Sequence, residues 1–487
     1  MIKEQFMDKK LRENLILNSL YQILAIFVPL ITAPYLGRIL KADQIGTYTF
    51  VHSIVSYFSH FAMLGIMNYG SREIAKVRDD KNARSKVFCE IYAMQVLTAG
   101  VSVIVYVIYA FLSHTEYQLI TKLMIIWTAS NLLDVGWYCT GMEQFRTIVK
   151  RNIVIKTLNI VLILTLVRAY SDLNIYTIIM AGCQLLSQII ISFVVIKDVK
   201  ISLPKFSEVW PRFKPNFLLF LPTIAATVYQ VMDKIMIGAI SSKVDLAYYE
   251  YADKIIQVPL LIFGAMGTVM LSRMSNVRAK ADDSEAGLLS MSMDLSMVLA
   301  SIFAFGLASV SVELVDVYYG DGFHPSGLIM LMLTPVIFLN GWANVLRMQY
   351  VIPRGLDSIY VKATIAGAIV NLIINFIFIP RYGSVGAAIG TIIAQIVVTL
   401  VFTVYSRKDL PLKTYFKNNI PFMLIGILMF IIVKLVQFLH SENLIGLAID
   451  ILVGGSFYVL ASAIVSKRYP NHIIGSVFNK LNRKKSS

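Results

Sequence analysis

Residues 217–240 read FLLFLPTIAATVYQVMDKIMIGAI. About 20 apolar residues cross the hydrocarbon core of a bilayer as a helix, so this stretch predicts a transmembrane span. Asp233 and Lys234 are its charged residues, and a charge at mid-membrane costs roughly 2.5 to 3.5 kcal/mol on insertion scales. Ionisable groups in such a position usually face a wet cavity and mark a transport pathway. The stretch therefore favours a membrane transporter.

The whole chain has the composition of an integral membrane protein. Of its 487 residues, 57% are hydrophobic and 15% are charged, and the mean hydropathy is +0.69, far from the usual balance of a soluble chain. Apolar runs of about 20 residues predict an all-α, polytopic fold with about fourteen transmembrane helices. The predicted spans are 15–37, 46–68, 87–112, 118–140, 153–169, 175–196, 216–240, 246–271, 288–311, 327–350, 363–379, 387–405, 421–439 and 445–466.

Basic residues predict which side of the membrane each loop faces. Most of the 44 Lys and Arg residues fall in the two tails and in the gaps after even-numbered spans. Since basic loops are retained in the cytoplasm, we expect both ends of the chain to be cytoplasmic. The net charge of +15 then reflects this bias and an attraction to anionic headgroups, and we expect no nucleic-acid partner. The gaps after odd-numbered spans hold Arg38, Lys41, Arg168, Lys243 and Arg381.

An internal repeat predicts two bundles of the same orientation. Residues 37–72 align without gaps with the residues 201 positions later, and the identities fall at corresponding helix ends. The paired residues are Gly37 and Gly238, Ile39 and Ile240, Tyr48 and Tyr249, Ile54 and Ile255, Ser71 and Ser272, and Arg72 and Arg273. We therefore expect six-helix bundles at 1–196 and 216–405, a cytoplasmic linking loop at 197–215, a loop and extra helix pair at 406–466, and a basic cytoplasmic tail at 467–487.

The loops leave no room for an enzymatic domain. The longest external gap, SVELVDVYYGDGFHPSG at 311–327, is about 17 residues long, whereas a membrane glycan polymerase or transferase needs a larger external loop with catalytic groups. A GxxxxGK[ST] phosphate cradle is absent, so the chain itself does not hydrolyse ATP. We expect no catalytic residue, no cofactor and no metal site. Uphill work would come from an ion gradient, the membrane potential or removal of the product.

Several sequence motifs, in order, resemble the Wzx-type polysaccharide repeat-unit flippases of the multidrug, oligosaccharidyl-lipid and polysaccharide exporter superfamily. The resemblance covers nearly the whole chain. The motifs are PYLGRILKADQIGTYTFVHSIVSYFSHFAMLGIMNYGSREIAK at 34–76, GWYCTGMEQF at 136–145, VMDKIMIGAI at 231–240 followed by YYEYADKI at 248–255, VIPRGLDSIY at 351–360, and NLIINFIFIPRYGSVGAAIGT at 371–391.

The resemblance implies an alternating-access transporter of two bundles in a bacterial inner or plasma membrane. Such proteins move a polyprenyl-diphosphate-linked oligosaccharide to the outer leaflet for capsule, O-antigen or exopolysaccharide assembly. Expected partners are that lipid, membrane lipid, H⁺ or Na⁺, and a glycan polymerase, with the chain acting as a monomer. A cation-coupled multidrug exporter of the same superfamily is the main alternative, and a scramblase would have the same sequence features.

The strongest site candidates lie on spans 7 and 8. Gln230 and Lys234 share a helical face, and Glu250, Asp253 and Lys254 form a stripe on the next helix. At 1.5 Å per residue both clusters lie roughly 10 Å below the outer surface. Lys234 and Lys254 would attract the diphosphate, while Asp233, Glu250 and Asp253 would balance them or carry a coupling ion. The alternative is a salt-bridge network that locks the helices together.

The first bundle offers further candidates. Arg38 lies at the outer edge, where it would contact substrate or anchor the helix at the interface. Trp127, Asn131, Asp134 and Tyr138 are spaced 4, 3 and 4 residues apart, and Lys122 lies nearer the outer end; an aromatic and amide stripe suits sugar binding. Asp134 is a further candidate for charge balance or ion coupling. His52 and His60 suggest a proton relay or helix contacts, and Asn371 and Asn375 suggest helix contacts.

Overall fold

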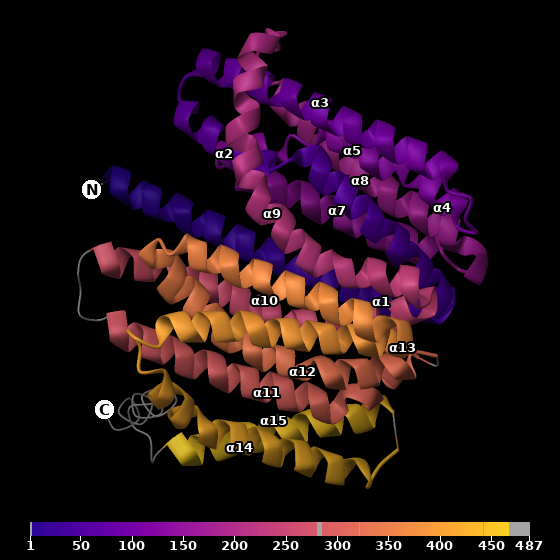
Figure 1. Ribbon diagram of the computed structural model, residues 1–487, viewed down its shortest axis with the longest axis vertical. Helices are drawn as coiled ribbons and strands as arrows, with labels where there is room; N and C mark the ends of the chain where they lie inside the picture. Colours follow the sequence, from indigo (N-terminus) through magenta and orange to yellow (C-terminus); the bar gives the residue numbers. More distant parts are fainter. Residues whose placement is uncertain (1, 280–284, 321, 442, 467–487) are drawn as a thin grey trace. The chain divides into compact units, whose positions relative to one another are not determined.

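The computed structural model describes the chain apart from residues 1, 280–284, 321, 442 and 467–487, and it leaves the side chains of 1–27, 218–219, 221–230 and 279 undescribed. Within the described residues every regular element is helical (Figure 1). In this described part of the chain, ten helical segments are long and apolar enough to cross a membrane. The all-α, multi-pass prediction is confirmed, while the count of fourteen crossings and the cytoplasmic ends stay predictions. The predicted tail at 467–487 and the side chain of Gln230 lie outside the described residues.

Long helices joined by short connections make up the chain. Two of the ten candidate spans, 28–77 and 357–406, contain a non-helical residue at Lys41 and at Gly383, respectively. The helices are α1 Ile2–Met63, α2 Ile66–Val77, α3 Lys81–Leu112, α4 Gln118–Leu123, α5 Ile125–Ser130, α6 Gly136–Gly141, α7 Phe145–Leu166, α8 Leu173–Ile196, α9 Phe206–Ile240, α10 Lys243–Ala279, α11 Glu285–Tyr319, α12 His324–Val345, α13 Asp357–Ser406, α14 Leu412–Gln437 and α15 Leu444–Ser466. Short elements are the 3₁₀ turns η1 Asn131–Leu133, η2 Tyr170–Asp172 and η4 Ile352–Arg354, and the π-helical η3 Leu346–Val351.

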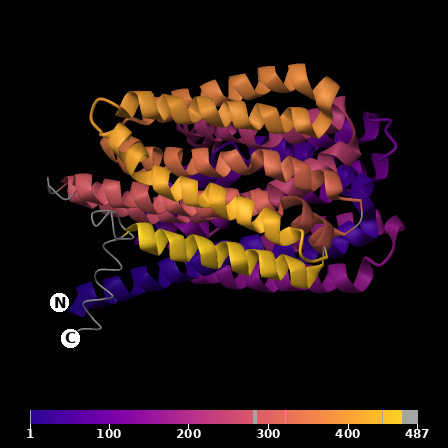
Figure 2. The same ribbon diagram turned by 90° about the horizontal axis from the view of Figure 1, so that it is seen from below.

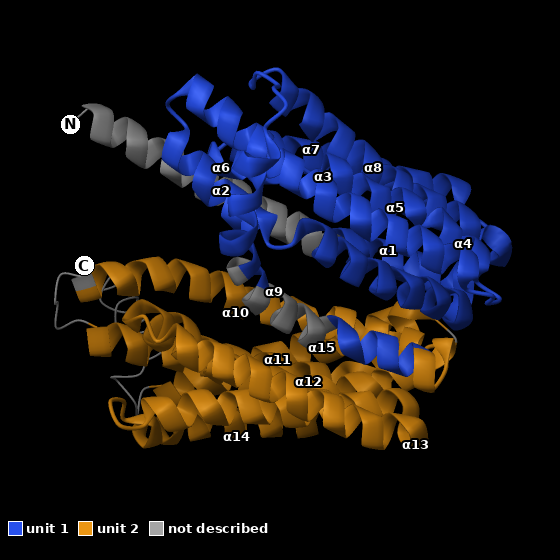
Figure 3. Cartoon of the chain, turned by 45° about the horizontal axis from the view of Figure 1, so that its top comes forward, with its two compact units in different colours: residues 1–238 blue, residues 239–487 orange. Residues whose placement is uncertain are grey.

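The chain forms two compact units, residues 1–238 and 239–487 (Figure 3). In the first unit α1 contacts α3 and α7, α7 contacts α8, and α8 contacts α4 and α5, which return to α3. These contacts close a ring of helices, and α2 packs against α3 and α6. The ring encloses the polar side chains of α5 and η1 that are discussed below.

The second unit is organised around α12. This helix contacts α10, α11 and α13, and the C-terminal pair α14 and α15 packs against α11. The helices of this unit lie side by side in both views (Figures 1 and 2). The extra helix pair expected at 406–466 is thus attached to the unit through α11.

The junction between the units differs from the sequence prediction. Helix α9 already begins at Phe206, so the second half of the linking loop predicted at 197–215 is helical. The compact units divide at 238/239 instead of 215/216. The helix break at Lys41 and the connection between Ile240 and Lys243 are 201 residues apart within a residue or two, and the repeat relation of the two bundles stays a prediction.

Two glycines allow α2 and α6 to approach each other closely. A Cβ on Gly70 would lie 2.5 Å from Cε3 of Trp137. A Cβ on Gly141 would lie 2.7 Å from the carbonyl oxygen of Ser71 and 2.8 Å from Cβ of Ile74. Small residues at such crossings let helix backbones pack without a gap.

We expect Gly141→Ala to lower stability by about 1–3 kcal/mol, because the added methyl group overlaps the α2 backbone. Thermal unfolding of the detergent-solubilised protein would measure the loss. Gly182→Ala on α8 is the matched control, since its Cβ would meet no atom within 4 Å and should be neutral or stabilising. Equal melting temperatures for the two variants would contradict the proposed close contact.

The connection between α14 and α15 is held by a buried carboxylate. Asp450 on α15 is fully buried, and Nε2 of His440 lies 3.1 Å from its Oδ1. Gln437 donates from Nε2 to Oδ2 of Asp450 at 3.0 Å and to Oε2 of Glu313 at 3.1 Å. The bond to Asp450, followed by the backbone carbonyl of Ser441, raises the pKa of His440 above its ordinary value. Protonation of His440 therefore stabilises this end of the helix pair.

We expect this stabilisation to be complete below the ordinary histidine pKa of about 6.5 and to be lost as pH rises through the raised pKa. The melting temperature of the wild type should exceed that of His440→Gln by more at pH 5.5 than at pH 8.5. Thermal unfolding at the two pH values measures the difference. His114→Gln, at an exposed position, is the control, and a wild-type advantage independent of pH would refute the role of His440.

Candidate functional site

Lys254 on α10 is the best-defined cation of the candidate site. Its Nζ lies 3.4 Å from Oε1 of Glu250, one helical turn earlier, and 4.7 Å from the ring centroid of Tyr251. The Lys254 side chain keeps 30% of its surface exposed, against 13% for Glu250. A carboxylate and an aromatic face thus hold the ammonium from one side, and its exposed side can meet a further anion.

The aromatic platform under Lys254 is fixed by its own packing. The ring of Tyr251 lies 4.3 Å from that of Tyr319 on α11 and 4.5 Å from that of Phe323, centroid to centroid. Tyr319 also donates its hydroxyl hydrogen to the Tyr251 carbonyl at 3.2 Å. These contacts restrict the orientation of Tyr251, and therefore the position of the lysine above it.

Asp253, the other carboxylate of this stripe, has a different neighbour. Nε2 of Gln257 donates to Oδ1 of Asp253 at 2.9 Å. Glu250, Asp253 and Lys254 thus lie on one helix as the sequence predicts, and Lys254 forms its ion pair with Glu250.

Asp233 and Lys234 on α9 differ in burial although they are adjacent. Asp233 is 5% exposed, whereas Lys234 is only half-buried. Successive residues on a helix point about 100° apart, so one side chain enters the packing while its neighbour remains partly accessible. The predicted contact between these residues and Lys254 would join the two compact units, and it stays a prediction.

Trp127 lies at the end of a row of rings in the first unit. Trp127 meets the His52 ring edge-on at 4.8 Å, and His52 stacks on Tyr48 at 5.6 Å. His60 Nδ1 lies 2.6 Å from the Ser56 carbonyl oxygen, which is a contact within one helix. The geometry of both histidines therefore fits helix packing better than a relay.

The two remaining cations predicted for the site in the first unit, Lys122 and Arg38, lie near a helix end or a helix break. Lys122 Nζ lies 4.9 Å from the ring centroid of Phe111. Arg38 is exposed and precedes the backbone break at Lys41 by three residues.

In the second unit, Asn375 donates to Oδ1 of Asn371 at 3.2 Å. Both asparagines are fully buried. Their hydrogen bond lies within α13, so the expected contact between helices stays a prediction.

The predicted single face of Trp127, Asn131, Asp134 and Tyr138 is wrong. Helix α5, which holds Trp127, is followed by the 3₁₀ turn η1, and the next helix, α6, starts only at Gly136. Asp134 leaves helical geometry at φ −77°, ψ 83° and accepts a hydrogen bond from the Gly136 N–H at 3.2 Å. Aspartate favours such turns because its side chain competes with the helical backbone bonds. Tyr138 consequently points elsewhere and donates to Oδ2 of Asp198 at 2.6 Å.

Gln95 on α3 provides hydrogen bonds to backbone carbonyls at this helix break, and it is not among the residues predicted from the sequence. Its Nε2 donates to the carbonyls of Asn131 at 2.8 Å and Asp134 at 3.0 Å, while its Oε1 accepts from Trp137 Nε1 at 2.8 Å. Asn131 in turn donates to Oγ of Ser59 at 3.0 Å. Discontinuous helices at membrane depth often line transport sites. The only signal in the sequence was one amide within the apolar run of α3.

Arg347 is a second residue that sequence reasoning missed. It lies in the π-helical turn η3, within the predicted tenth span. With the Asn344 amide in its hydrogen-bonding orientation, Nη2 of Arg347 donates to the Asn344 side-chain oxygen at 2.9 Å, and the guanidinium lies 5.8 Å from the Tyr360 ring centroid. Among the described residues of its own unit, no carboxylate pairs with Arg347. π-helical turns are frequent at functional sites.

Comparison with known families identifies the chain. Residues 11–277 match the family described as "Polysaccharide biosynthesis protein". The chain belongs to this family. Residues 156–454 of this flippase also match the family "Lipid II flippase MurJ". The two overlapping matches confirm the resemblance to Wzx-type flippases of the multidrug, oligosaccharidyl-lipid and polysaccharide exporter superfamily, and they indicate a transporter rather than an enzyme.

Individual relatives match 44% to 82% of this flippase. It is 22% identical over 406 residues to a protein named "Putative O-antigen transporter" from Escherichia coli (strain K12), covering 82% of this chain and 97% of that protein. It is 24% identical over 222 residues to the lipid II flippase MurJ of Thermosipho africanus, 44% of each chain. Both relatives support a multi-pass protein of the bacterial cell membrane.

Solved structures share the fold. The lipid II flippase MurJ in an inward closed conformation superposes with a TM-score of 0.70 at 18% identity, over 93% of this chain and 98% of that one. A multidrug resistance transporter of the MATE family in an inward-facing conformation gives 0.57 at 13% identity, over 81% and 99%. These similarities establish the two-unit helical fold of this flippase.

We expect Gln95→Leu to destabilise this flippase, because it strands two carbonyls and an indole N–H, each costing about 1–3 kcal/mol when buried and unpaired. Thermal unfolding in detergent measures the loss. Gln188→Leu on α8 is the matched control, since the Gln188 amide is also buried but its Oε1 has no hydrogen-bond partner among the described residues. A smaller loss for Gln95→Leu than for Gln188→Leu would contradict the role of Gln95.

Proposed function

We propose that this flippase moves a polyprenyl-diphosphate-linked oligosaccharide from the inner to the outer leaflet for surface polysaccharide assembly. The observation that carries the proposal is that the Lys254 side chain keeps 30% of its surface exposed inside the candidate span 243–278. A cation that keeps an accessible face at that depth needs a polar, anionic partner. A lipid diphosphate crossing the membrane supplies one.

In this proposal each cation has its own role. Lys234 and Lys254 attract the diphosphate from α9 and α10, and Arg38 and Lys122 attract it near the outer ends of their helices. Arg347, which no described carboxylate of its unit neutralises, adds a bidentate phosphate donor.

The sugars and the counter-charges use other side chains. Trp127 offers an aromatic edge for a sugar ring, and the amides of Asn131 and Gln230 offer hydrogen bonds to hydroxyl groups. Glu250 lies against Lys254 and tunes its charge. Asp233, Asp253, Glu250 and Asp134 balance the cations or bind a coupling H⁺ or Na⁺.

Transport proceeds by alternating access in this proposal. The segments 1–196 and 216–405 rock as bundles and expose the cations to each leaflet in turn. The backbone breaks at Lys41 and Gly383 allow paired spans to tilt separately. An ion gradient drives the cycle, the flippase acts as a monomer, and a glycan polymerase takes up the product on the outer side.

Charge separates this function from multidrug export by the same fold. The cations Lys254 and Arg347 of the second unit suit an anionic lipid, whereas a cationic drug requires an acidic site. A membrane glycan polymerase or transferase has less support, because the family relatives are flippases and transporters.

We expect Lys254→Gln and Lys234→Ala to reduce export of surface glycan at least tenfold without loss of membrane insertion, since a hydrogen bond to a charged group contributes about 1.5–3 kcal/mol. The lipid-linked glycan should accumulate on the cytoplasmic side. Lys254→Arg should retain part of the activity, and Arg347→Gln should reduce it.

The matched control is Lys150→Gln, which removes an exposed charge at the start of α7. Export equal to wild type in both Lys254→Gln and Lys234→Ala would remove these residues from the site. If deletion of the whole protein, without a redundant carrier, left the glycan lipid reaching the outer leaflet, the proposed function itself would fail.

A further inference from the structure

The connecting segment, residues 197–214, runs from the end of α8 through the first turns of α9 and carries large apolar side chains on its surface. Leu203 is 98% exposed, Ile201 67%, Phe206 64% and Trp210 63%. Four exposed lysines accompany them in the sequence: Lys197, Lys200, Lys205 and Lys214. Phe206 and Trp210 lie 5.8 Å apart, centroid to centroid. Such a mixture of apolar and basic residues is typical of a segment that lies in a membrane interface.

The exposure of these side chains is a built feature, because the backbone of the segment is fixed to α3. The Lys200 N–H donates to Oγ of Ser85 at 3.1 Å, and the Ser202 N–H donates to Sγ of Cys89 at 3.3 Å. With these two peptide groups held by α3, the side chain of Leu203 is directed away from the unit.

Ion pairs attach both ends of the segment as well. Nη2 of Arg84 lies 2.8 Å from Oδ1 of Asp198, just after α8. Nη2 of Arg212, in the first turns of α9, lies 2.6 Å from Oε2 of Glu90. Glu90 is 5% exposed at its side chain, so this second pair is well shielded from water and resists screening.

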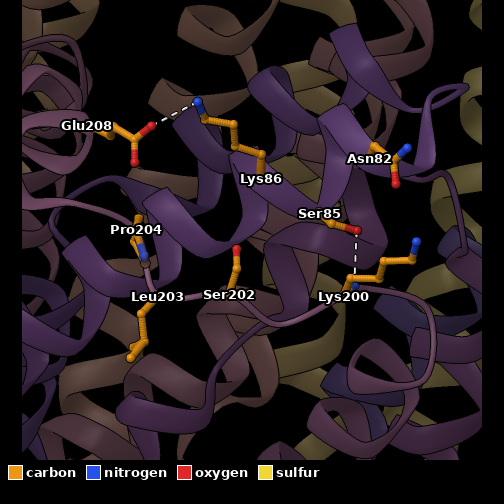
Figure 4. A pocket seen from close by; sticks show the side chains of 8 residues that line it. All are labelled: Asn82, Ser85, Lys86, Lys200, Ser202, Leu203, Pro204 and Glu208. Atoms are coloured by element: carbon orange, nitrogen blue, oxygen red, sulfur yellow. Dashed lines mark hydrogen bonds and ion pairs between the residues drawn. The ribbon is translucent and has the colours of Figure 1, made fainter.

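A pocket of about 310 Å³ lies between this segment and the start of α3. Ser85, Lys86, Lys200 and Ser202 line it together with Glu208 (Figure 4). Nζ of Lys86 lies 2.8 Å from Oε1 of Glu208, and this pair lowers the pKa of Glu208. The carboxylate therefore stays ionised and neutralises one of the two lysines, which leaves a net positive pocket. The Ser202 hydroxyl lines it as a donor, whereas the Ser85 hydroxyl already donates to the Lys81 carbonyl at 2.7 Å.

We propose that the connecting segment is embedded in the cytoplasmic leaflet and that the pocket binds the phosphate of an anionic phospholipid headgroup. The positive-inside prediction places this segment on the cytoplasmic side, where anionic lipids attract basic residues. Ile201, Leu203 and Trp210 enter the acyl boundary, which removes their apolar surface from water. The headgroup of the same lipid layer then lies at the level of the lysines and serines.

This lipid site is separate from the transport site proposed on α9 and α10. It uses the connection between two helices instead of charges inside spans, and its occupant stays in the inner leaflet. Lipid bound there would hold the start of α9 against α3 through the contacts of Arg212 and Glu208. The inference does not rest on the identity of the transported lipid.

The first experiment measures phospholipid binding to the purified full chain. Native mass spectrometry would titrate phosphatidylglycerol against phosphatidylcholine. We expect Lys200→Gln and the double variant Lys86→Gln with Lys200→Gln to weaken phosphatidylglycerol binding, the double variant at least fivefold. The matched control removes two exposed lysines, Lys413 and Lys417 on α14, and should change binding less than twofold.

Lys200→Gln alone keeps the proposal falsifiable if the double variant folds poorly, because Lys200 contacts α3 through its backbone N–H and the substitution leaves that bond in place. Unchanged phosphatidylglycerol binding in that folded variant would overturn the headgroup site. Inorganic phosphate competing as strongly as phosphatidylglycerol would also overturn it, since a soluble anion would then be the occupant.

The second experiment measures membrane insertion. In vesicles that contain brominated phospholipid, fluorescence of the wild type minus that of Trp210→Phe reports quenching of Trp210. We expect strong quenching that decreases in Leu203→Ser, a change at an almost fully exposed position. An unquenched Trp210 would place the segment in water and overturn the proposal. If instead the wild type bound phosphatidylglycerol and showed quenching of Trp210 but did not transport the glycan lipid, only the proposed function would fail.

Discussion

The absence of water in the bilayer core is the constraint on which the rest of this structure depends. Every buried backbone group must find a partner within the protein, and each break in a helix needs a specific donor. Gln95 provides it for the carbonyls of Asn131 and Asp134. Gln437 donates hydrogen bonds to the side-chain carboxylates of Glu313 and Asp450, which are also buried. These amides permit polar chemistry inside an apolar bundle.

The charges that are incompletely satisfied carry the functional argument. Lys254 has a carboxylate and an aromatic ring on one side and keeps an accessible face. Arg347 has an amide and an aromatic ring but no described carboxylate of its unit. Because a cation is costly among helices that cross a membrane, the accessible side of Lys254 and the lack of a described carboxylate beside Arg347 support the proposed anionic substrate.

Family membership and local geometry support the proposal independently. The family matches identify a flippase fold with two units, and relatives of this fold handle chemically different cargo. The cations on α10 and η3 support the proposed lipid diphosphate substrate. In the further proposal, the basic and apolar segment 197–214 binds a different lipid, a phospholipid that stays in the inner leaflet and is not transported.

The sequence by itself determined the membrane class, the position of most spans, the repeat and the stripe on α10, because these depend on local hydrophobicity and on spacing along one helix. It placed Glu250 one turn from Lys254, and the structure brings them together. Only the tertiary structure decided the break at Asp134, the role of Gln95 and the surroundings of Arg347. Gln95 lies about 40 residues from the carbonyls it binds, and helical periodicity carries no information about a partner on another helix.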